Sequence, residues 1–209
     1  MVARSAELMT LVRAIVADDA ATTSRLLATG SLASAQAGEG ATREAAADYY
    51  LAGIEHYLYA GDTALHIAAA AYRLPIVRQL ITLGADVGAR NRRGAQPLHY
   101  AADGSPGSPH WDPGAQGATV TCLIQAGADP DATDKSGVTP LHRAVRTRSA
   151  AAVQALLEGG ADAGRKNRAG STPMQLATWT TGRGGSGSPE SRAQQAEIVR
   201  LLHRHGVTR

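Results

Sequence analysis

Apolar positions along this chain follow a helical period and come in short paired segments rather than in one long run. In the clearest pair, Leu141, Ala144 and Val145 share one face of the first predicted helix, and a second predicted helix follows at residues 151–157 with its own apolar face. Thr139 is placed to cap the first helix, and Pro140 lies in its first turn, where a backbone N–H would have no helical partner. One such pair cannot cover its own apolar face, so the pattern predicts helix pairs stacked on one another.

The paired segments begin with a recurring motif. Four copies start at Gly61, Gly94, Gly137 and Gly170, which lie 33, 43 and 33 residues apart. The third copy reads Gly-Val-Thr-Pro-Leu-His, and each of the first three copies is followed by a second motif, Gly-Ala-Asp. This period and the Thr-Pro-Leu-His motif resemble those of the ankyrin repeat. The whole chain is also similar to bacterial ankyrin-repeat proteins that carry insertions between the two helices of a repeat.

The resemblance implies an all-α solenoid of stacked helix-turn-helix units joined by β-hairpin-like loops. The chain would form a single ankyrin-repeat domain over residues 1–209. Residues 1–60 would be a degenerate N-terminal cap with an insertion, and residues 170–209 would be a C-terminal repeat with an insertion. The three repeats between them would span residues 61–93, 94–136 and 137–169.

Repeats two and four each carry extra residues at the same position of the repeat, the turn between their two helices. Residues 103–114 and 180–189 are rich in Gly, Ser and Pro, so both segments are predicted to be loops. Because they occupy equivalent turns, we expect them on the same edge of the stack, as two walls that flank repeat three. Within the second loop, residues 182–187 match G-x-G-x-x-G but follow a helix rather than a strand. A plain loop is the simpler interpretation, and an anion held beside Arg183 is the alternative.

Residues 31–60 replace what would be a short hairpin before the first full repeat. Four of the six tyrosines of the chain lie between positions 49 and 59. The segment predicts an enlarged hairpin or a short helix. It would serve either as a cap over the end of the stack or as a binding lip, since tyrosine gives rigid amphipathic contact area.

Three histidines occupy one repeat position and invite a catalytic or metal-binding interpretation. At His66, His99 and His142 the ring can hydrogen-bond the backbone and the threonine hydroxyl of its own motif, which satisfies a buried polar group. The alternative is a ladder of metal ligands, but Gln175 interrupts the series in repeat four. We therefore predict a structural role for these histidines, and no metal or other cofactor.

In the ankyrin family, partners usually meet the tips of the hairpins and the exposed face of the first helices. Most of the residues that the resemblance places there are basic, which predicts a positive strip that steers an acidic partner. The alternative is that the tips are simply solvated. The tip residues are Tyr59, Arg92, Arg93, Lys135, Ser136, Arg168 and Ala169, and the helix-face residues are Asp103, Arg146 and Trp179.

Two residues break the apolar pattern inside the first helices. Tyr100 and Arg143 stand where other repeats carry Ile67 and Leu176. A partly buried Arg143 needs a partner, because an unpaired charge there is destabilising, and Asp103 is the best candidate by its spacing. An intramolecular ion pair is one interpretation, and a polar recess that holds a small ligand is the other. The recess would be lined by Tyr100, Asp103, Arg143 and Arg146, with His110, Trp111 and Trp179 at its border.

Composition narrows the functional hypotheses. The net charge is +3, the only cysteine is Cys122, and no run of 18 apolar residues occurs, so we expect a cytoplasmic protein without a membrane span. The leading hypothesis is a protein-interaction scaffold for an acidic partner. The alternative is a small-molecule or anion binder, or an unusual enzyme, although no nucleophile–base arrangement can be read in the recess. Nucleic-acid binding is a third hypothesis, and the modest charge and the lack of interleaved aromatic residues argue against it.

Overall fold

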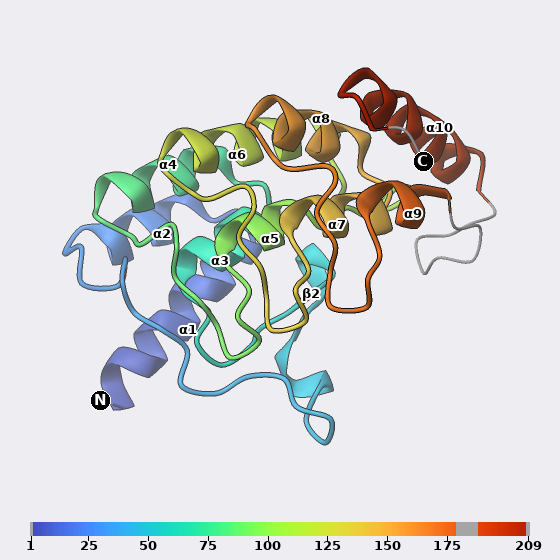
Figure 1. The fold of residues 1–209 in the computed structure, drawn as a ribbon. Helices are drawn as coiled ribbons and strands as arrows, with labels where there is room; N and C mark the ends of the chain where they lie inside the picture. Colours follow the sequence, from blue (N-terminus) through green and yellow to red (C-terminus); the bar gives the residue numbers. More distant parts are fainter. Residues whose placement is uncertain (1, 179–187, 208–209) are drawn as a thin grey trace.

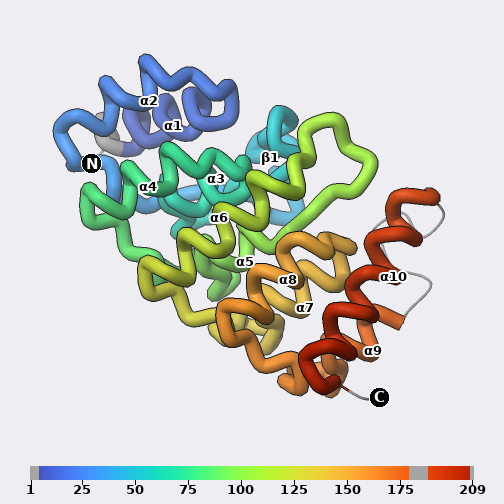
Figure 2. Tube along the Cα trace, turned by 90° about the horizontal axis from the view of Figure 1, so that it is seen from above, coloured from blue at the N-terminus to red at the C-terminus, as the bar shows by residue number. Residues whose placement is uncertain are grey.

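The computed structural model describes residues 2–178 and 188–207, and within them the chain forms ten α-helices that follow one another as five pairs (Figure 1). The first helices of the pairs are α1 (Val2–Val16), α3 (Ala64–Ala70), α5 (Pro97–Ala101), α7 (Pro140–Arg146) and α9 (Pro173–Thr178). The second helices are α2 (Ala20–Leu27), α4 (Leu74–Thr82), α6 (Pro113–Gln125), α8 (Ala150–Glu158) and α10 (Pro189–Arg204). Successive first helices pack side by side, and so do the second helices from α4 to α10, which confirms the predicted all-α solenoid (Figures 1 and 2).

The regular repeats begin with a shared capping arrangement. At α3, Thr63 Oγ1 accepts the backbone N–H of His66 at 3.4 Å, and His66 Nδ1 accepts the backbone N–H of Thr63 at 3.1 Å. Thr139 and His142 form the same reciprocal pair at the start of α7. The arrangement satisfies N–H groups that the first turn of a helix leaves without partners. It confirms the predicted hydrogen bonds of the histidines to the backbone and to threonine.

The same histidines also join each repeat to the next one. Because Nδ1 of each ring accepts a backbone N–H, the proton lies on Nε2, which donates to a carbonyl oxygen of the following repeat. The Nε2–O distances are 3.2 Å from His66 to Ala95, 3.0 Å from His99 to Val138, and 3.0 Å from His142 to Ser171. In repeat four, Gln175 keeps only the intra-repeat part of this pattern among the hydrogen bonds of the described residues, by accepting Thr172 N–H at 2.9 Å.

The core is a continuous layer of aliphatic side chains between the first and the second helices. Leucine, isoleucine, valine and many alanines fill it, and the chain contains no phenylalanine. Tyr100 is the largest fully buried side chain among the described residues. Tyr100 lies on α5 and, within the described part of the chain, is the one large ring in this otherwise aliphatic layer.

The hairpins between repeats form a row along the lower edge of the molecule in Figure 1. Their tips are linked by backbone hydrogen bonds, so each tip is held against the one before it. The N–O distances are 2.7 Å from Arg92 to Ala60, 2.9 Å from Lys135 to Arg93, and 3.1 Å from Arg168 to Ser136. Side chains at these tips are therefore presented from a fixed backbone.

The N-terminal insertion forms an enlarged hairpin, one of the two structures expected for it. Its elements are the 3-10 helix η1 (Ala47–Tyr49), strand β1 (Tyr50–Leu51), the 3-10 helix η2 (Ala52–Ile54) and strand β2 (His56–Tyr57). The two strands form a two-stranded antiparallel sheet in which Tyr50 is opposite Tyr57 and Leu51 is opposite His56. Glu55 closes the hairpin in the left-handed region, with φ of 50°.

The insertion in repeat two lies between α5 and α6, where it is predicted. It leaves α5 with five residues, compared with seven in α3 and in α7. Figure 2 shows it as a loop that extends past the helices beside β1, and Ser105 Oγ donates a hydrogen bond to Glu55 Oε2 at 3.0 Å. The insertion in repeat four falls between α9 and α10, but residues 179–187 lie outside the described part of the chain. The expectation of two walls around repeat three thus stays a prediction.

Candidate functional site

A groove with a volume of about 1280 Å³ runs along the first helices, from the N-terminal hairpin to the start of α10. Strand β2 and insertion residues 104–109 line one end, and the first turns of α10 line the other. Helix α7 lies between them and contributes Arg143, Val145 and Arg146. All four residues of the predicted polar recess line this groove, namely Tyr100, Asp103, Arg143 and Arg146.

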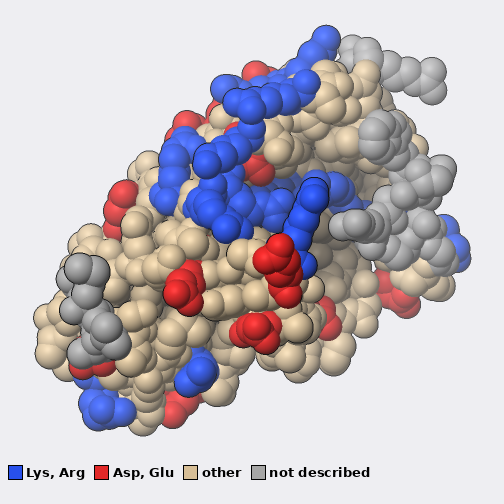
Figure 3. All heavy atoms as spheres, turned by 90° about the horizontal axis from the view of Figure 1, so that it is seen from below, with Lys and Arg blue, Asp and Glu red and all other residues tan. Residues whose placement is uncertain are grey.

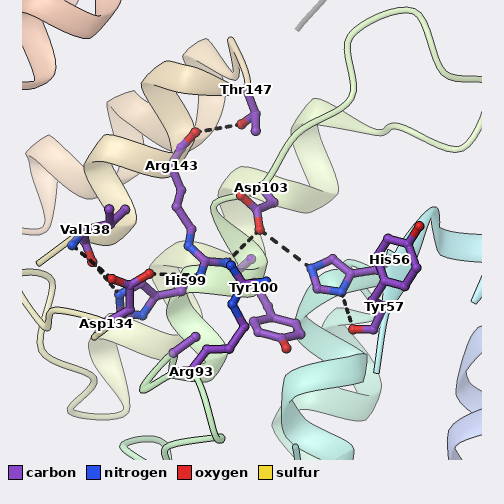
Figure 4. A network of polar contacts seen from close by, with 12 residues as sticks. His56, Tyr57, Arg93, His99, Tyr100, Asp103, Asp134, Val138, Arg143 and Thr147 are labelled. Carbon is purple, nitrogen blue, oxygen red and sulfur yellow. Dashed lines mark hydrogen bonds and ion pairs between the residues drawn. The ribbon is translucent and has the colours of Figure 1, made fainter. Parts of the chain in front are cut away.

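A charged network crosses the groove at α7 (Figure 4). The Arg143 guanidinium donates from Nη1 to Asp103 Oδ2 at 2.9 Å and from Nη2 to Asp134 Oδ2 at 3.3 Å. The ion pair expected between Arg143 and Asp103 is therefore present, and Asp134 is a second partner. The Arg143 side chain is only 10% exposed, so an unpaired charge at this position would be strongly destabilising.

The three groups of the network hold one another in their charged forms. Burial alone would raise the pKa of Asp103, but Arg143 lowers it to about 2. Burial also opposes ionisation of Asp134, yet the backbone N–H groups of Ser136 and Val138, together with Arg143, keep its pKa below the ordinary value. Burial would lower the pKa of Arg143, but Asp103 and Asp134 raise it above its ordinary value. The network is therefore fully ionised at neutral pH.

Tyr100 connects this network to the N-terminal hairpin and to repeat one. Its ring centroid lies 4.2 Å from that of His56 and 5.1 Å, edge-on, from that of His66. Its hydroxyl donates to both carboxylate oxygens of buried Asp62 at 2.9 Å, and burial followed by the charge of Asp62 raises the pKa of Tyr100. His56 Nε2 in turn lies 3.6 Å from Asp103 Oδ2. The hairpin and repeats one to three are thus joined through polar side chains.

Exposed basic side chains come from three successive hairpins and form what we call the basic strip. Figure 3 shows Lys and Arg side chains gathered across the middle of the face that carries the hairpin tips. The strip consists of Arg90, Arg92, Arg93, Lys135, Arg165, Lys166 and Arg168, all of them exposed. Among the described residues, no Asp or Glu forms an ion pair with any of these seven side chains.

Two arginines of the strip are anchored to the N-terminal insertion. Arg93 Nη1 donates to the Tyr59 hydroxyl at 2.8 Å, and the Arg93 guanidinium lies 4.9 Å from the centroid of the Tyr59 ring. Arg92 Nη2 donates to the backbone carbonyl of Ala41 at 2.8 Å. The predicted tip residues Tyr59, Arg92 and Arg93 are therefore brought together, whereas Lys135 and Arg168 follow along the row of tips.

Comparison with protein families agrees with this geometry. Residues 32–108 match the family described as ankyrin repeats (3 copies), and residues 123–177 match the family described as ankyrin repeats (many copies). The chain is an ankyrin-repeat protein. The unmatched residues between the two matches, 109–122, hold the end of the first insertion and most of α6. A comparison with curated proteins gives no match. Ankyrin repeats generally mediate protein–protein interactions.

Two residues predicted at the border of the recess, His110 and Trp111, lie elsewhere in this ankyrin-repeat protein. Trp111 is absent from the groove and lines a separate pocket of about 270 Å³ between the insertion and the N-terminal hairpin, together with His110. The indole Nε1 donates to Gln116 Oε1 at 2.8 Å, and Gln116 Nε2 donates to the carbonyl of Ala101 at 2.9 Å. Gln116 thus holds the indole against the base of the insertion. The other predicted residues Trp179 and Arg183 lie outside the described part of the chain.

Sequence reasoning missed Asp134, although a signal for it exists. Asp134 occupies the hairpin position that carries Asn91 and Asn167 in the neighbouring ankyrin repeats. Its Oδ1 accepts the backbone N–H groups of Ser136 and Val138 at 2.8 and 3.1 Å, as the asparagine oxygens do in their own hairpins. Oδ2 is left to receive Arg143. The exchange of asparagine for aspartate lies at the end of repeat two, directly before the repeat that places arginine at an apolar position.

Two further residues of the groove, His56 and Tyr57, were missed because the register of a hairpin cannot be read from a tyrosine-rich segment.

Within residues 2–178 and 188–207 of this ankyrin-repeat protein, no three His, Cys, Asp or Glu side chains gather in an arrangement that could hold a metal ion. No helix in the same residues has the length and the hydrophobicity that spanning a bilayer requires.

Proposed function

We propose that this ankyrin-repeat protein binds an acidic segment of a protein partner, which lies along the groove and is held by the basic strip. The observation that carries the proposal is the basic strip itself. Its seven cations come from three consecutive hairpins and have no carboxylate partners among the described residues. Such a row of one charge attracts and orients a segment of the opposite charge.

The charged network has the opposite property, because its cation and its anions already satisfy one another. Arg143 is engaged by Asp103 and Asp134. An incoming anion would therefore meet the exposed strip and the exposed Arg146 rather than the buried guanidinium of Arg143. We assign the network to shaping the groove and the strip to binding.

The size of the groove favours a peptide over a small molecule. Its volume of about 1280 Å³ exceeds the range of about 300–1,000 Å³ in which small-molecule sites usually fall. Small-molecule sites are also mostly apolar and enclose their ligand, whereas this groove carries charged residues along its length and reaches from the N-terminal hairpin to α10. An extended segment of a partner matches this shape.

The test uses two fluorescent synthetic peptides of about 12 residues, which span about 40 Å when extended. One peptide is rich in glutamate, and the other is rich in lysine. We expect the full-length protein to bind the glutamate-rich peptide, with an affinity that falls steeply as salt is added. The variant Lys135→Glu/Arg168→Glu should bind it about tenfold more weakly at low salt, because two cations of the strip become anions.

The matched control reverses the same number of charges on the second helices. Arg25 and Arg78 are exposed on α2 and α4, away from the row of tips, so Arg25→Glu/Arg78→Glu has the same net charge as the strip variant. It should bind nearly as well as the unmodified protein. Equal weakening by the two double variants, or equal binding of the two peptides, would contradict the proposed function.

A further inference from the structure

A further pocket, distinct from the one lined by Trp111, adjoins the hairpin end of the groove. It has a volume of about 320 Å³ and is formed by the N-terminal insertion and the first hairpin tip. Tyr57 and Tyr59, whose ring centroids are 6.4 Å apart, contribute aromatic walls, and Ala41 and Ala46 add apolar surface. Three arginines also line the pocket, namely Arg43, Arg92 and Arg93.

Backbone contacts fix the shape of this pocket. Ala41 N–H donates to the carbonyl of Leu58 at 2.7 Å, and the Arg92 side chain donates to the carbonyl of Ala41. Gly40 approaches the opposite segment so closely that an added Cβ would lie 2.4 Å from the backbone nitrogen of Ala60. The two segments are thus held side by side without space for a larger residue. A site that is already formed loses less conformational entropy when it binds.

The pocket and the groove share a boundary. Tyr57, Tyr59 and Arg93 line both of them, so a chain lying in the groove can pass over these three side chains into the pocket. Arg93 is held on Tyr59 by the hydrogen bond to its hydroxyl and by the stacking of its guanidinium on the ring. The boundary is therefore an ordered aromatic and cationic ridge.

The positive charges of the pocket arginines are not neutralised by ion pairs among the described residues. Among the described residues, no carboxylate forms an ion pair with Arg43, Arg92 or Arg93. Guanidinium groups bind carboxylates through paired N–H donors, and they also stack on aromatic rings. Tyrosine rings favour an aromatic partner in a tilted or offset arrangement. The pocket thus combines walls that suit an aromatic side chain with a rim that suits carboxylates.

We infer that this pocket takes an aromatic side chain of the acidic segment, and that carboxylates next to that side chain pair with Arg43, Arg92 and Arg93. The inference rests on the proposed function, because the same segment continues along the groove and the basic strip. It adds a requirement that charge alone does not impose. The partner segment carries an aromatic residue at the end that meets the N-terminal insertion.

The experiment compares two fluorescent peptides of equal length and charge, made of glutamate and glycine with either one tryptophan or one alanine near one end. The full-length protein should bind the tryptophan peptide roughly tenfold more tightly, the scale on which one buried aromatic anchor contributes to an interface. Tyr57→Ala should abolish this difference, because the tryptophan peptide loses an aromatic contact that the alanine peptide never makes. Tyr57→Phe keeps the ring and should preserve the difference.

A second variant tests the pocket without removing a tyrosine. Ala46→Phe places a ring where the partner's aromatic side chain would lie, and it should also abolish the preference for tryptophan. Thermal unfolding followed by circular dichroism establishes that each variant is folded. The strip variant Lys135→Glu/Arg168→Glu should weaken both peptides by the same factor, because it acts on charge alone.

The outcomes separate the two proposals. If both peptides bind equally, or if Tyr57→Ala and Ala46→Phe leave the tryptophan preference intact, the aromatic pocket is overturned and the proposed function stands. If neither peptide binds the full-length protein, both proposals are overturned. A tryptophan preference that is lost in both pocket variants and kept in Tyr57→Phe supports the inference.

Discussion

The histidines of the repeat motif and the network around Arg143 are buried to a similar degree, yet their polar groups are satisfied in different ways. His99 is neutral, because burial, followed by the charge of Arg143, lowers its pKa to about 4. Its two ring nitrogens are satisfied by backbone groups of its own repeat and the next. Arg143, Asp103 and Asp134 are charged and are satisfied by one another.

The difference reflects how often each arrangement is needed. Every junction between repeats presents the same backbone groups, so one neutral ring can serve at each junction. The charged network occurs where an insertion interrupts repeat two. Asp103 is the first residue of that insertion, and its ion pair with Arg143 holds it against α7. The repeated histidines thus maintain the stack of repeats, and the charged network around Arg143 shapes the groove.

The largest expected effect comes from removing the cation of the network. Arg143→Leu leaves the carboxylates of Asp103 and Asp134 buried beside an apolar side chain, so the free energy of unfolding should fall by about 3–5 kcal/mol. Urea denaturation measures the change. The double variant Arg143→Leu/Asp103→Ala should recover part of the loss, because one of the two uncompensated carboxylates is gone. A gain in stability for Arg143→Leu alone would show that the network is not needed for the fold.

The next effect concerns the neutral histidines and pH. Because the pKa of His99 is lowered from about 6.5 in the unfolded chain to about 4, the unfolded state binds more protons between these values. The stability that His99 contributes is therefore complete above pH 6.5 and is lost as the pH falls to 4, by about 3 kcal/mol. In His99→Gln, the glutamine seen at position 175 in repeat four, the free energy of unfolding should vary less over this range. Identical pH profiles for the two proteins would contradict the assignment.

A smaller loss belongs to the charged network and occurs at lower pH. The pKa of Asp103 falls from 3.8 to about 2 on folding, so its contribution is present above pH 4 and is lost as the pH drops toward 2, by about 2 kcal/mol. Asp103→Asn should remove this dependence below pH 4 and leave most of the dependence between pH 4 and 6.5, because burial is the largest cause of the lowered pKa of His99. Unfolding followed at closely spaced pH values separates the two ranges. Loss of the upper-range dependence in Asp103→Asn would contradict the assignment of that range to His99.

The smallest effect distinguishes the two functions of Asp134. Asp134→Asn gives the hairpin the residue found at positions 91 and 167, so the bonds from Ser136 and Val138 should remain. Only the charge opposite Arg143 is lost, and the free energy of unfolding should fall by about 1 kcal/mol. The equivalent change Asn91→Asp serves as the comparison, since it adds a carboxylate beside buried Asp62 and should destabilise the protein more. Equal stability of Asp134→Asn and the unmodified protein would assign Asp134 to the hairpin alone.

Much of this architecture could be predicted because ankyrin repeats are encoded locally. Thr139, Pro140 and His142 form their cap within one motif, and the position of Arg143 required a partner that spacing placed at Asp103. These contacts depend on the repeat period, which can be read from the spacing of the motifs in the sequence. The pairing of Arg143 with Asp103 could be predicted for the same reason, since Arg143 lies in a regular helix and Asp103 directly follows the regular part of the preceding repeat.

The remainder of the site depends on segments that the period does not govern. The side of the insertion on which Trp111 lies is decided by its hydrogen bond to Gln116, and no spacing rule indicates that contact. The register of β1 and β2 places Tyr57 at the ridge between groove and pocket, and a slip by one residue would have placed His56 there. Asp134 was missed for another reason, because its resemblance to the asparagines of other hairpins concealed its charge.

The histidine bonds between repeats all run in one direction, from each motif to the carbonyl of the unit that follows it. Each of these three boundaries is joined by its own histidine, and none of the three histidine bonds spans two boundaries. Unfolding can therefore proceed unit by unit from an end, as in a one-dimensional chain of coupled elements. Breaking the hydrogen bond of His142 would release α9 and α10 while the hydrogen bonds of His66 and His99 remain. Amide exchange should therefore report a gradient of protection along the array.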